Sequence, residues 1–171
     1  AKLVAHEIDV HVTRGKNGEG QPLHIFSTGL PGSLETEEGL AIYSEELARA
    51  ATPGGRWRRG LVCRAILWAK EMGFRDLYEH ISGVASPELA WGISVRLKRG
   101  MSDPSLPGVF AKDVVYYRGE RRISQWLQGG GSLSTLYVGK VGLEHPVKQW
   151  LESGLLEARE VPELFSQNHG L

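Results

Sequence analysis

Two histidines and a glutamate near the start of the chain are the residue types found on a zinc-hydrolase helix. Glu7 follows directly after His6, and a second histidine, His11, lies five positions after the first. Imidazoles are common zinc ligands, and a glutamate beside a ligand can take a proton from water and pass it on to a leaving amine. The segment therefore predicts a metal site with His6 and His11 as ligands and Glu7 as the catalytic acid and base.

The spacing of the two histidines makes a geometric demand on their helix. On a regular α-helix, five residues turn through about 500°, so the two rings would point about 140° apart and could not reach one ion. A π-helical widening adds a residue to the turn and brings position i+5 back beneath position i. We therefore predict a helix over residues 2–14 that widens between His6 and His11.

A catalytic zinc site takes three protein ligands, so one more must come from elsewhere in the chain. Residues 36–41 supply two adjacent acids at the start of a second predicted helix. We choose Glu38, because Gly39 after it allows two helices to approach closely, and we keep Glu37 as the alternative. Glu45 lies two turns further on and could accept a hydrogen bond from a ligand histidine.

Further polar residues have both a functional and a structural interpretation. Arg14 could bind the terminal carboxylate of a substrate or form a salt bridge at the helix end. Asn17 and Gln21 could contact substrate or order the loop that contains them. Lys112 and Tyr116 lie four apart on one helix face, where Lys112 could bind substrate and Tyr116 could donate to an oxyanion or pack as an aromatic residue.

The remaining pattern predicts a mainly α fold. Residues 15–33 are rich in glycine and proline and are expected to be a loop, and the tail from residue 157 is expected to be weakly held. Ser86 and Pro87 have the residue types of a helix start. After the metal-binding helix, the next predicted helix begins at Ser33 or Thr36. Later helices are predicted at about 57–72, 75–81, 87–99, 110–127, 132–140 and 146–153. We expect one domain over residues 1–171.

Composition excludes several classes of function. Twenty basic residues balance twenty acidic ones, which argues against binding to nucleic acid or to a membrane surface. Apolar runs of the ~20 residues that a membrane span needs do not occur. The single cysteine, Cys63, rules out an internal disulfide, is expected to be buried, and is compatible with a reducing compartment, so a cytoplasmic protein is expected. Because the chain opens directly on its strongest motif, we expect it to be the C-terminal part of a longer protein.

Together these motifs resemble a known family, the bacterial flavohemoglobin-expression-modulating QEGLA-motif proteins. Animal relatives of that family are the microtubule-associated tyrosine carboxypeptidases, which are zinc enzymes that remove the C-terminal tyrosine of α-tubulin. The glutamine in the family's name is Glu37 here, and the chain has no segment resembling a tubulin-binding region. The matching stretches are His6-Glu7-x-x-x-His11-x-x-Arg14, Asn17-Gly18, Gln21-Pro22-Leu23, Gly29-Leu30-Pro31-Gly32, Thr36-Glu37-Glu38-Gly39-Leu40-Ala41 and residues 110–119.

The resemblance implies a helical metallopeptidase-like domain whose zinc ion lies between the first helix and the one that follows. It implies His6, His11 and Glu38 as zinc ligands, Glu7 as the acid and base, and a substantial region before the zinc helix. The expected function is a zinc-dependent peptidase, carboxypeptidase-like, that acts on a peptide or protein C-terminus. The alternative is a non-catalytic regulatory protein with a structural zinc site, in which protein would fill the fourth position of the metal.

Overall fold

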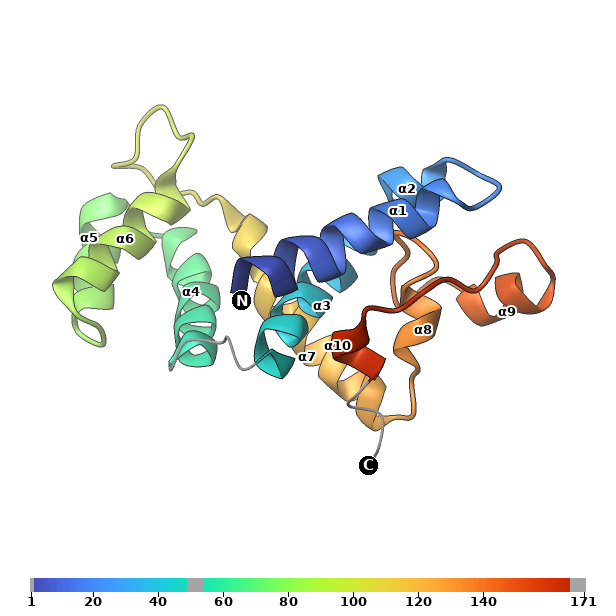
Figure 1. Cartoon of the computed structure of the whole chain (residues 1–171). Coiled ribbons are helices and arrows are strands. Elements are labelled where there is room, and N and C mark those ends of the chain that lie inside the picture. Colours follow the sequence, from blue (N-terminus) through green and yellow to red (C-terminus); the bar gives the residue numbers. More distant parts are fainter. Residues whose placement is uncertain (1, 49–53, 167–171) are drawn as a thin grey trace. The chain divides into compact units, whose positions relative to one another are not determined.

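Helices make up the regular structure of the chain in a computed structural model that describes residues 2–48 and 54–166 (Figure 1). Within those ranges no strand occurs, and the prediction of a mainly α protein is confirmed. None of the helices in these ranges is long and apolar enough to cross a bilayer. The chain divides into two compact units, and one domain over residues 1–171 stays a prediction. Unit 1 comprises residues 1–52 and 118–171, and unit 2 comprises residues 53–117.

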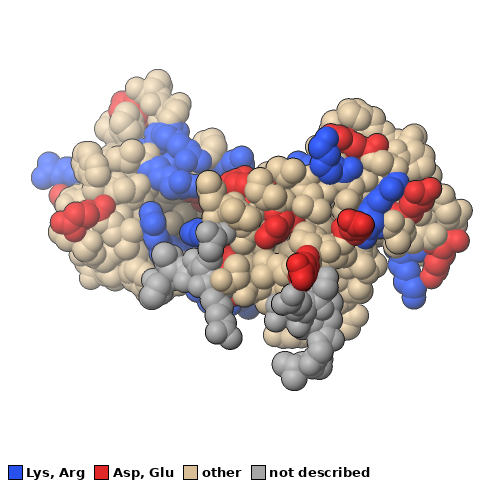
Figure 2. Space-filling view, in the orientation of Figure 1, with Lys and Arg blue, Asp and Glu red and all other residues tan. Residues whose placement is uncertain are grey.

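Unit 1 contains the first and the last elements of the chain. Its core is apolar and is built from both of its segments, with Val10 and Leu40 from the first and Ile123 and Leu136 from the second. In Figure 2, acidic and basic side chains are interspersed over its visible face, which agrees with the balanced composition. Its elements are η1 (Val4–Val12), α1 (Thr13–Glu19), α2 (Ile25–Thr28), α3 (Ser33–Leu47), most of α7 (Val114–Gln128), α8 (Leu133–Leu136), α9 (Val147–Glu152) and α10 (Glu163–Ser166).

The glycine-rich stretch 15–33 is more ordered than the sequence predicts. Instead of a continuous loop it contains most of α1 and all of α2. Gly18 explains the difference, because a Cβ atom at this position would lie 2.1 Å from the carbonyl oxygen of Phe26. This glycine therefore allows two short helices to pack backbone against backbone, and the loop prediction is wrong for these residues.

The prediction of a weakly held tail is also wrong up to Ser166. Phe165 on α10 is fully buried in the core of unit 1. Its ring stacks on Tyr43 of α3 at 6.4 Å between centroids and lies 5.3 Å from the ring of Tyr137. These aromatic contacts hold the end of the described chain against the helix that carries Glu38.

A pair of glycines fixes the crossing of α3 and α7. A Cβ atom on Gly39 would lie 2.3 Å from the carbonyl carbon of Gly119, and one on Gly119 would lie 2.1 Å from the carbonyl oxygen of Glu35. Gly39 therefore does allow a close helix approach, as predicted, but its partner at that crossing is α7. The position of Glu38, one residue earlier, is set by this crossing.

Unit 2 comprises α4 (Gly55–Ala69), α5 (Phe74–Ser82), α6 (Pro87–Lys98), η2 (Ala111–Asp113) and the first residues of α7. The predicted cap of α6 is confirmed, since the Ser86 hydroxyl accepts a hydrogen bond from the Leu89 backbone N–H at 3.3 Å. Lys98 is buried, and its ammonium donates to four backbone carbonyls, those of Ala69, Met72, Leu106 and Gly108. Cys63 is half-buried, although the sequence predicted burial.

Candidate metal centre

The first helix has the widening that the spacing of the histidines requires. η1 is a π-helix over Val4–Val12, which confirms the prediction, and the Thr13 backbone N–H bonds to the carbonyl oxygen of Ile8, five residues earlier. Figure 1 draws η1 in dark blue next to α3 in cyan, and the two helices are packed together. Ser44 on α3 donates a hydrogen bond of 2.7 Å to the carbonyl oxygen of Ala5, so α3 helps to hold the unusual helix in place.

Three side chains converge at the junction of η1 and α3. One ligand atom from each of His6, His11 and Glu38 lies within 4.8 Å of the other two. The Nε2 atoms of both histidines are 3.8 Å from Oε2 of Glu38, and the two ring centroids are 5.1 Å apart. Ligands about 2.1 Å from a tetrahedral zinc ion lie about 3.4 Å from one another, so this donor set fits zinc after a small closure.

Each histidine is oriented by a carboxylate on its other ring nitrogen. Nδ1 of His6 lies 2.8 Å from Oε1 of Glu45, as predicted, and Nδ1 of His11 lies 2.9 Å from Oε1 of Glu37. An ionised carboxylate can only accept, so these bonds put each ring proton on Nδ1 and leave the lone pair on Nε2. Glu37, the alternative third ligand, therefore faces the side of His11 opposite to Glu38. Histidine ligands of metals are commonly oriented in this way.

Glu37, behind His11, is paired with two cations as well as with the histidine. Besides the bond to His11, its Oε2 accepts from Nη1 of Arg14 at 2.7 Å, and its Oε1 lies 3.2 Å from Nζ of Lys140. Burial alone would raise the pKa of Glu37, but the hydrogen bond from His11 and the charges of Arg14 and Lys140 outweigh it and lower the pKa below its ordinary value. Glu37 is therefore held as an acceptor for His11.

Arg14 forms a salt bridge, the structural one of the two roles that its sequence position suggested. Its side chain is 0% exposed, and besides the bond to Glu37 it donates from Nε to the Leu136 carbonyl and from Nη2 to the Val141 carbonyl, at 2.9 and 2.6 Å. Burial lowers its pKa, and the Glu37 charge opposes that effect. A guanidinium bonded at all three nitrogens inside the protein is not available to a substrate carboxylate, so the structure does not support the predicted substrate contact of Arg14.

Asn17 and Gln21 continue this row of side-chain contacts along α1 and just past its end. The Asn17 amide donates to the Tyr137 carbonyl at 2.6 Å, and the Gln21 amide donates to the Val138 carbonyl at 2.9 Å. Both amides also donate to backbone carbonyls within residues 157–160. Their side chains order distant backbone, which agrees with the structural interpretation rather than with substrate contact. The bonds from Arg14, Asn17 and Gln21 to the carbonyls of residues 136–141 are called the carbonyl clamp.

The whole chain, residues 1–171, matches the family described as microtubule-associated tyrosine carboxypeptidase. The chain belongs to the microtubule-associated tyrosine carboxypeptidase family. It is 36% identical over 168 residues to microtubule-associated tyrosine carboxypeptidase 1 of Rattus norvegicus, an alignment that covers 95% of this chain and 35% of that protein. The protein of the same name from Homo sapiens is also 36% identical over 168 residues, with the same coverage of each chain.

A further relative is the putative tyrosine carboxypeptidase MATCAP2 of Homo sapiens, 33% identical over 173 residues, which cover 98% of this chain and 32% of that protein. The chain thus spans about a third of the length of the curated relatives that it matches. The resemblance to the tyrosine carboxypeptidases, inferred from short motifs, is confirmed. The closer grouping with the bacterial QEGLA-motif proteins stays a prediction.

The group of three converging side chains does not include the other predicted site residues of this tyrosine carboxypeptidase family member. Glu7 is exposed on η1, next to His6. The pKa of His11 is raised chiefly by its hydrogen bond with Glu37, against burial, and the charges of Glu38 and Glu7 raise it further. Glu7 is therefore close enough to act electrostatically on the site. Lys112 and Tyr116 belong to unit 2, on η2 and at the start of α7, and their roles stay predictions.

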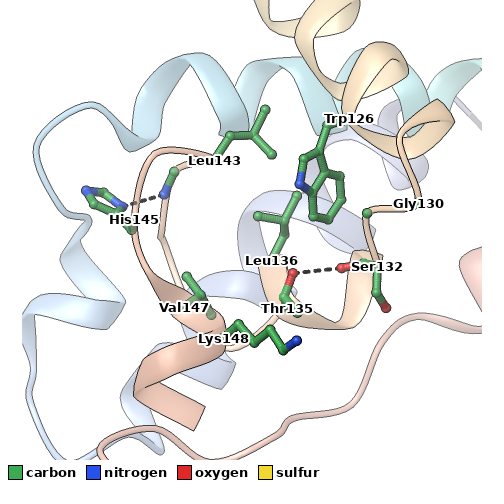
Figure 3. Close-up of a pocket in the computed structure, with 11 residues that line it drawn as sticks. Trp126, Gly130, Ser132, Thr135, Leu136, Leu143, His145, Val147 and Lys148 are labelled. Atoms are coloured by element: carbon green, nitrogen blue, oxygen red, sulfur yellow. Dashed lines mark hydrogen bonds between the residues drawn. The ribbon is translucent and has the colours of Figure 1, made fainter. Parts of the chain in front are cut away.

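Unit 1 of this family member also has a cavity of about 420 Å³ that shares no lining residue with the metal cluster. Figure 3 shows the Trp126 ring and the Leu136 and Leu143 side chains on its walls. His145 accepts a hydrogen bond from the Gly142 backbone N–H at 2.8 Å. The full lining is Trp126, Gly130, Gly131, Ser132, Thr135, Leu136, Gly142, Leu143, His145, Val147 and Lys148.

Proposed function

We propose that this chain carries the zinc centre of a carboxypeptidase that removes the last residue of a peptide or protein. The observation that carries the proposal is the convergence of His6, His11 and Glu38, with both histidines fixed from behind by carboxylates. The names of the relatives support it, because they are called tyrosine carboxypeptidases. A C-terminal tyrosine is therefore the first substrate residue to test.

The chemistry of the donor set supports zinc as the metal. Two imidazole nitrogens and one carboxylate oxygen are a common ligand set of catalytic zinc. Bound there, zinc would lower the pKa of a water molecule and polarise the peptide carbonyl. In the part of the chain that the structure describes, the cluster has three members. Structural zinc sites have four protein ligands, so this number favours the enzyme over a regulatory protein with a structural zinc site.

The chain's own groups divide the remaining work. Glu45 and Glu37 hold the protons of the two rings on Nδ1 and keep both Nε2 atoms directed at one point. We assign Glu7 the proton transfers: a carboxylate oxygen of Glu7 takes a proton from the attacking water and delivers it to the nitrogen of the leaving amine. The exposure of Glu7 and its place beside His6 support this role.

The test compares the wild-type chain with Glu7→Gln. Metal content is measured on the purified proteins, and cleavage is followed by mass spectrometry on peptides that end in tyrosine. We expect both proteins to bind one zinc ion and only the wild type to release tyrosine. Glu19→Gln, a change at an exposed acid on α1, is the matched control and should cleave as the wild type does. Unchanged cleavage by Glu7→Gln would refute the role of Glu7 in proton transfer. A wild-type protein that binds no zinc would refute the proposed zinc centre.

A further inference from the structure

A carboxypeptidase distinguishes a chain end from an internal peptide bond by binding the terminal carboxylate, and a fixed cation near the reacting centre does this best. The candidate from the sequence, Arg14, is wholly buried and bonded at all three guanidinium nitrogens. Another cation must therefore supply the contact. We propose that Lys140 binds the terminal carboxylate of the substrate, an inference that rests on the proposed function.

Lys140 lies close to the metal cluster. Its Nζ is 3.2 Å from Oε1 of Glu37, the same oxygen that accepts a hydrogen bond from Nδ1 of His11 at 2.9 Å. Those two contacts and the width of an imidazole ring put the ammonium within about 8 Å of Nε2 of His11. The terminal carboxylate is one residue away from the scissile carbonyl, about 4 Å along an extended chain. To reach the carboxylate while the carbonyl lies at the cluster, the ammonium would turn from Glu37 toward the cluster on its flexible four-carbon side chain.

The backbone of Lys140 is held in place before any substrate binds. Its N–H donates to the Phe26 carbonyl at 2.7 Å, and its carbonyl accepts from the Leu30 N–H at 3.1 Å. The side chain runs past two glycines, with Cε 3.6 Å from where a Cβ atom on Gly15 would lie and Cβ at the same distance from one on Gly29. A cation fixed in this way loses little conformational entropy on binding.

Lys140 is also the accessible member of the pair of cations that contact Glu37. Its side chain is 28% exposed, against 0% for Arg14. Because Arg14 bonds to Glu37 from inside the protein, Glu37 keeps a counter-charge when Lys140 turns toward a substrate. An ammonium has three N–H donors, so contact with Glu37 is compatible with a second carboxylate.

Lys2 is the competing candidate for this role. It pairs with Glu45, which orients His6, as Lys140 pairs with Glu37, which orients His11. The Lys2 side chain is 53% exposed, against 28% for Lys140, so it is less enclosed by the protein than Lys140. Lys16, 70% exposed and paired with Glu19, is a matched control lysine on the same unit.

The experiment measures binding of two peptides that differ only at the C-terminus, one a free carboxylate and one a carboxamide. Binding is measured by fluorescence anisotropy on zinc-loaded protein in the Glu7→Gln background, so that cleavage does not interfere. We expect a preference of at least about tenfold for the carboxylate. Lys140→Met should abolish the preference, Lys140→Arg should keep part of it, and Lys16→Met should leave it unchanged.

Zinc affinity, measured against a competing chelator, separates substrate binding from support of His11 through Glu37. Loss of the preference in Lys140→Met, with zinc affinity within about threefold of the parent, supports the proposal. The proposal is overturned if Lys140→Met keeps the preference, whether or not its zinc affinity falls. It is also overturned if the parent protein has no preference, or if Lys2→Met loses it in place of Lys140→Met.

Cleavage by the wild-type protein keeps this proposal distinct from the proposed function. If wild type binds the carboxylate through Lys140 but releases no amino acid, the carboxypeptidase fails and the carboxylate site stands. If wild type cleaves both peptides equally well and binds both equally, a peptidase stands and the role of Lys140 is overturned.

Discussion

Removing the carboxylate of Glu37 should affect stability and metal binding together, whereas removing that of Glu45 should affect mainly metal binding. Both acids orient a histidine of the cluster. Only Glu37 also pairs with Arg14, whose side chain is 0% exposed. In Glu37→Ala, a buried guanidinium would lose its counter-charge, which costs about 3–5 kcal/mol when one partner of a buried ion pair is removed. In Glu45→Ala, the lysine left behind is 53% exposed, and the loss should be about 1–3 kcal/mol.

Zinc affinity should fall in both variants by about 10–100-fold, because each histidine would lose the acceptor that fixes its ring. The free energy of unfolding is measured by urea denaturation of the metal-free proteins, followed by circular dichroism, and zinc affinity by titration against a chelator. Equal losses of the free energy of unfolding in the two variants would refute the larger stabilisation assigned to the buried Arg14–Glu37 pair. A Glu37→Ala protein with wild-type zinc affinity would refute its orienting role for His11.

Three further outcomes are expected. Gly39→Ala should lower the free energy of unfolding by about 1–3 kcal/mol or more in urea denaturation, since its Cβ atom would lie 2.3 Å from the Gly119 carbonyl carbon. Gly32→Ala is the comparison variant, at a glycine with open space around its Cβ position but a positive φ. Lys98→Met should leave four carbonyls without their shared donor and lower the free energy of unfolding by about 3 kcal/mol, whereas Lys70→Met, on the surface, should change it little. Removing metal with EDTA should abolish peptide cleavage and lower the melting temperature, and added zinc should restore both; cleavage that survives metal removal would contradict the proposed function.

The widened first helix could be predicted from the sequence because the chemistry left one solution. Two imidazoles five positions apart can face one ion only if the helix adds a residue to its turn, and η1 is such a helix. The choice between the two adjacent acids was harder, since both lie at the start of α3. The hint was Gly39, although the structure shows that this glycine serves the crossing with α7.

The contacts of Arg14, Asn17 and Gln21 with backbone carbonyls could not be predicted, because these acceptors lie 117 to 143 residues away in the chain. Asn17 and Gln21 were predicted to lie in a loop, and backbone carbonyls leave no mark in a sequence. The contact of Lys140 with Glu37 could not be predicted for the same reason, since it forms only after the segment that carries Lys140 is docked. The ordered packing around Gly18 was missed because a glycine at a tight contact and a glycine in a loop look alike.

The candidate metal ligands and the carbonyl clamp that supports them come from opposite ends of the chain. All three candidate ligands and both carboxylates behind them lie within the first 45 residues, whereas the carbonyls that hold Arg14 belong to residues 136–141. A gene fragment that stops before residue 118 would encode the three candidate ligands and both carboxylates behind them. It would lack the backbone carbonyls that hold Arg14 in place. Engineers who transplant this centre into another scaffold should therefore graft the late segment together with the early helices.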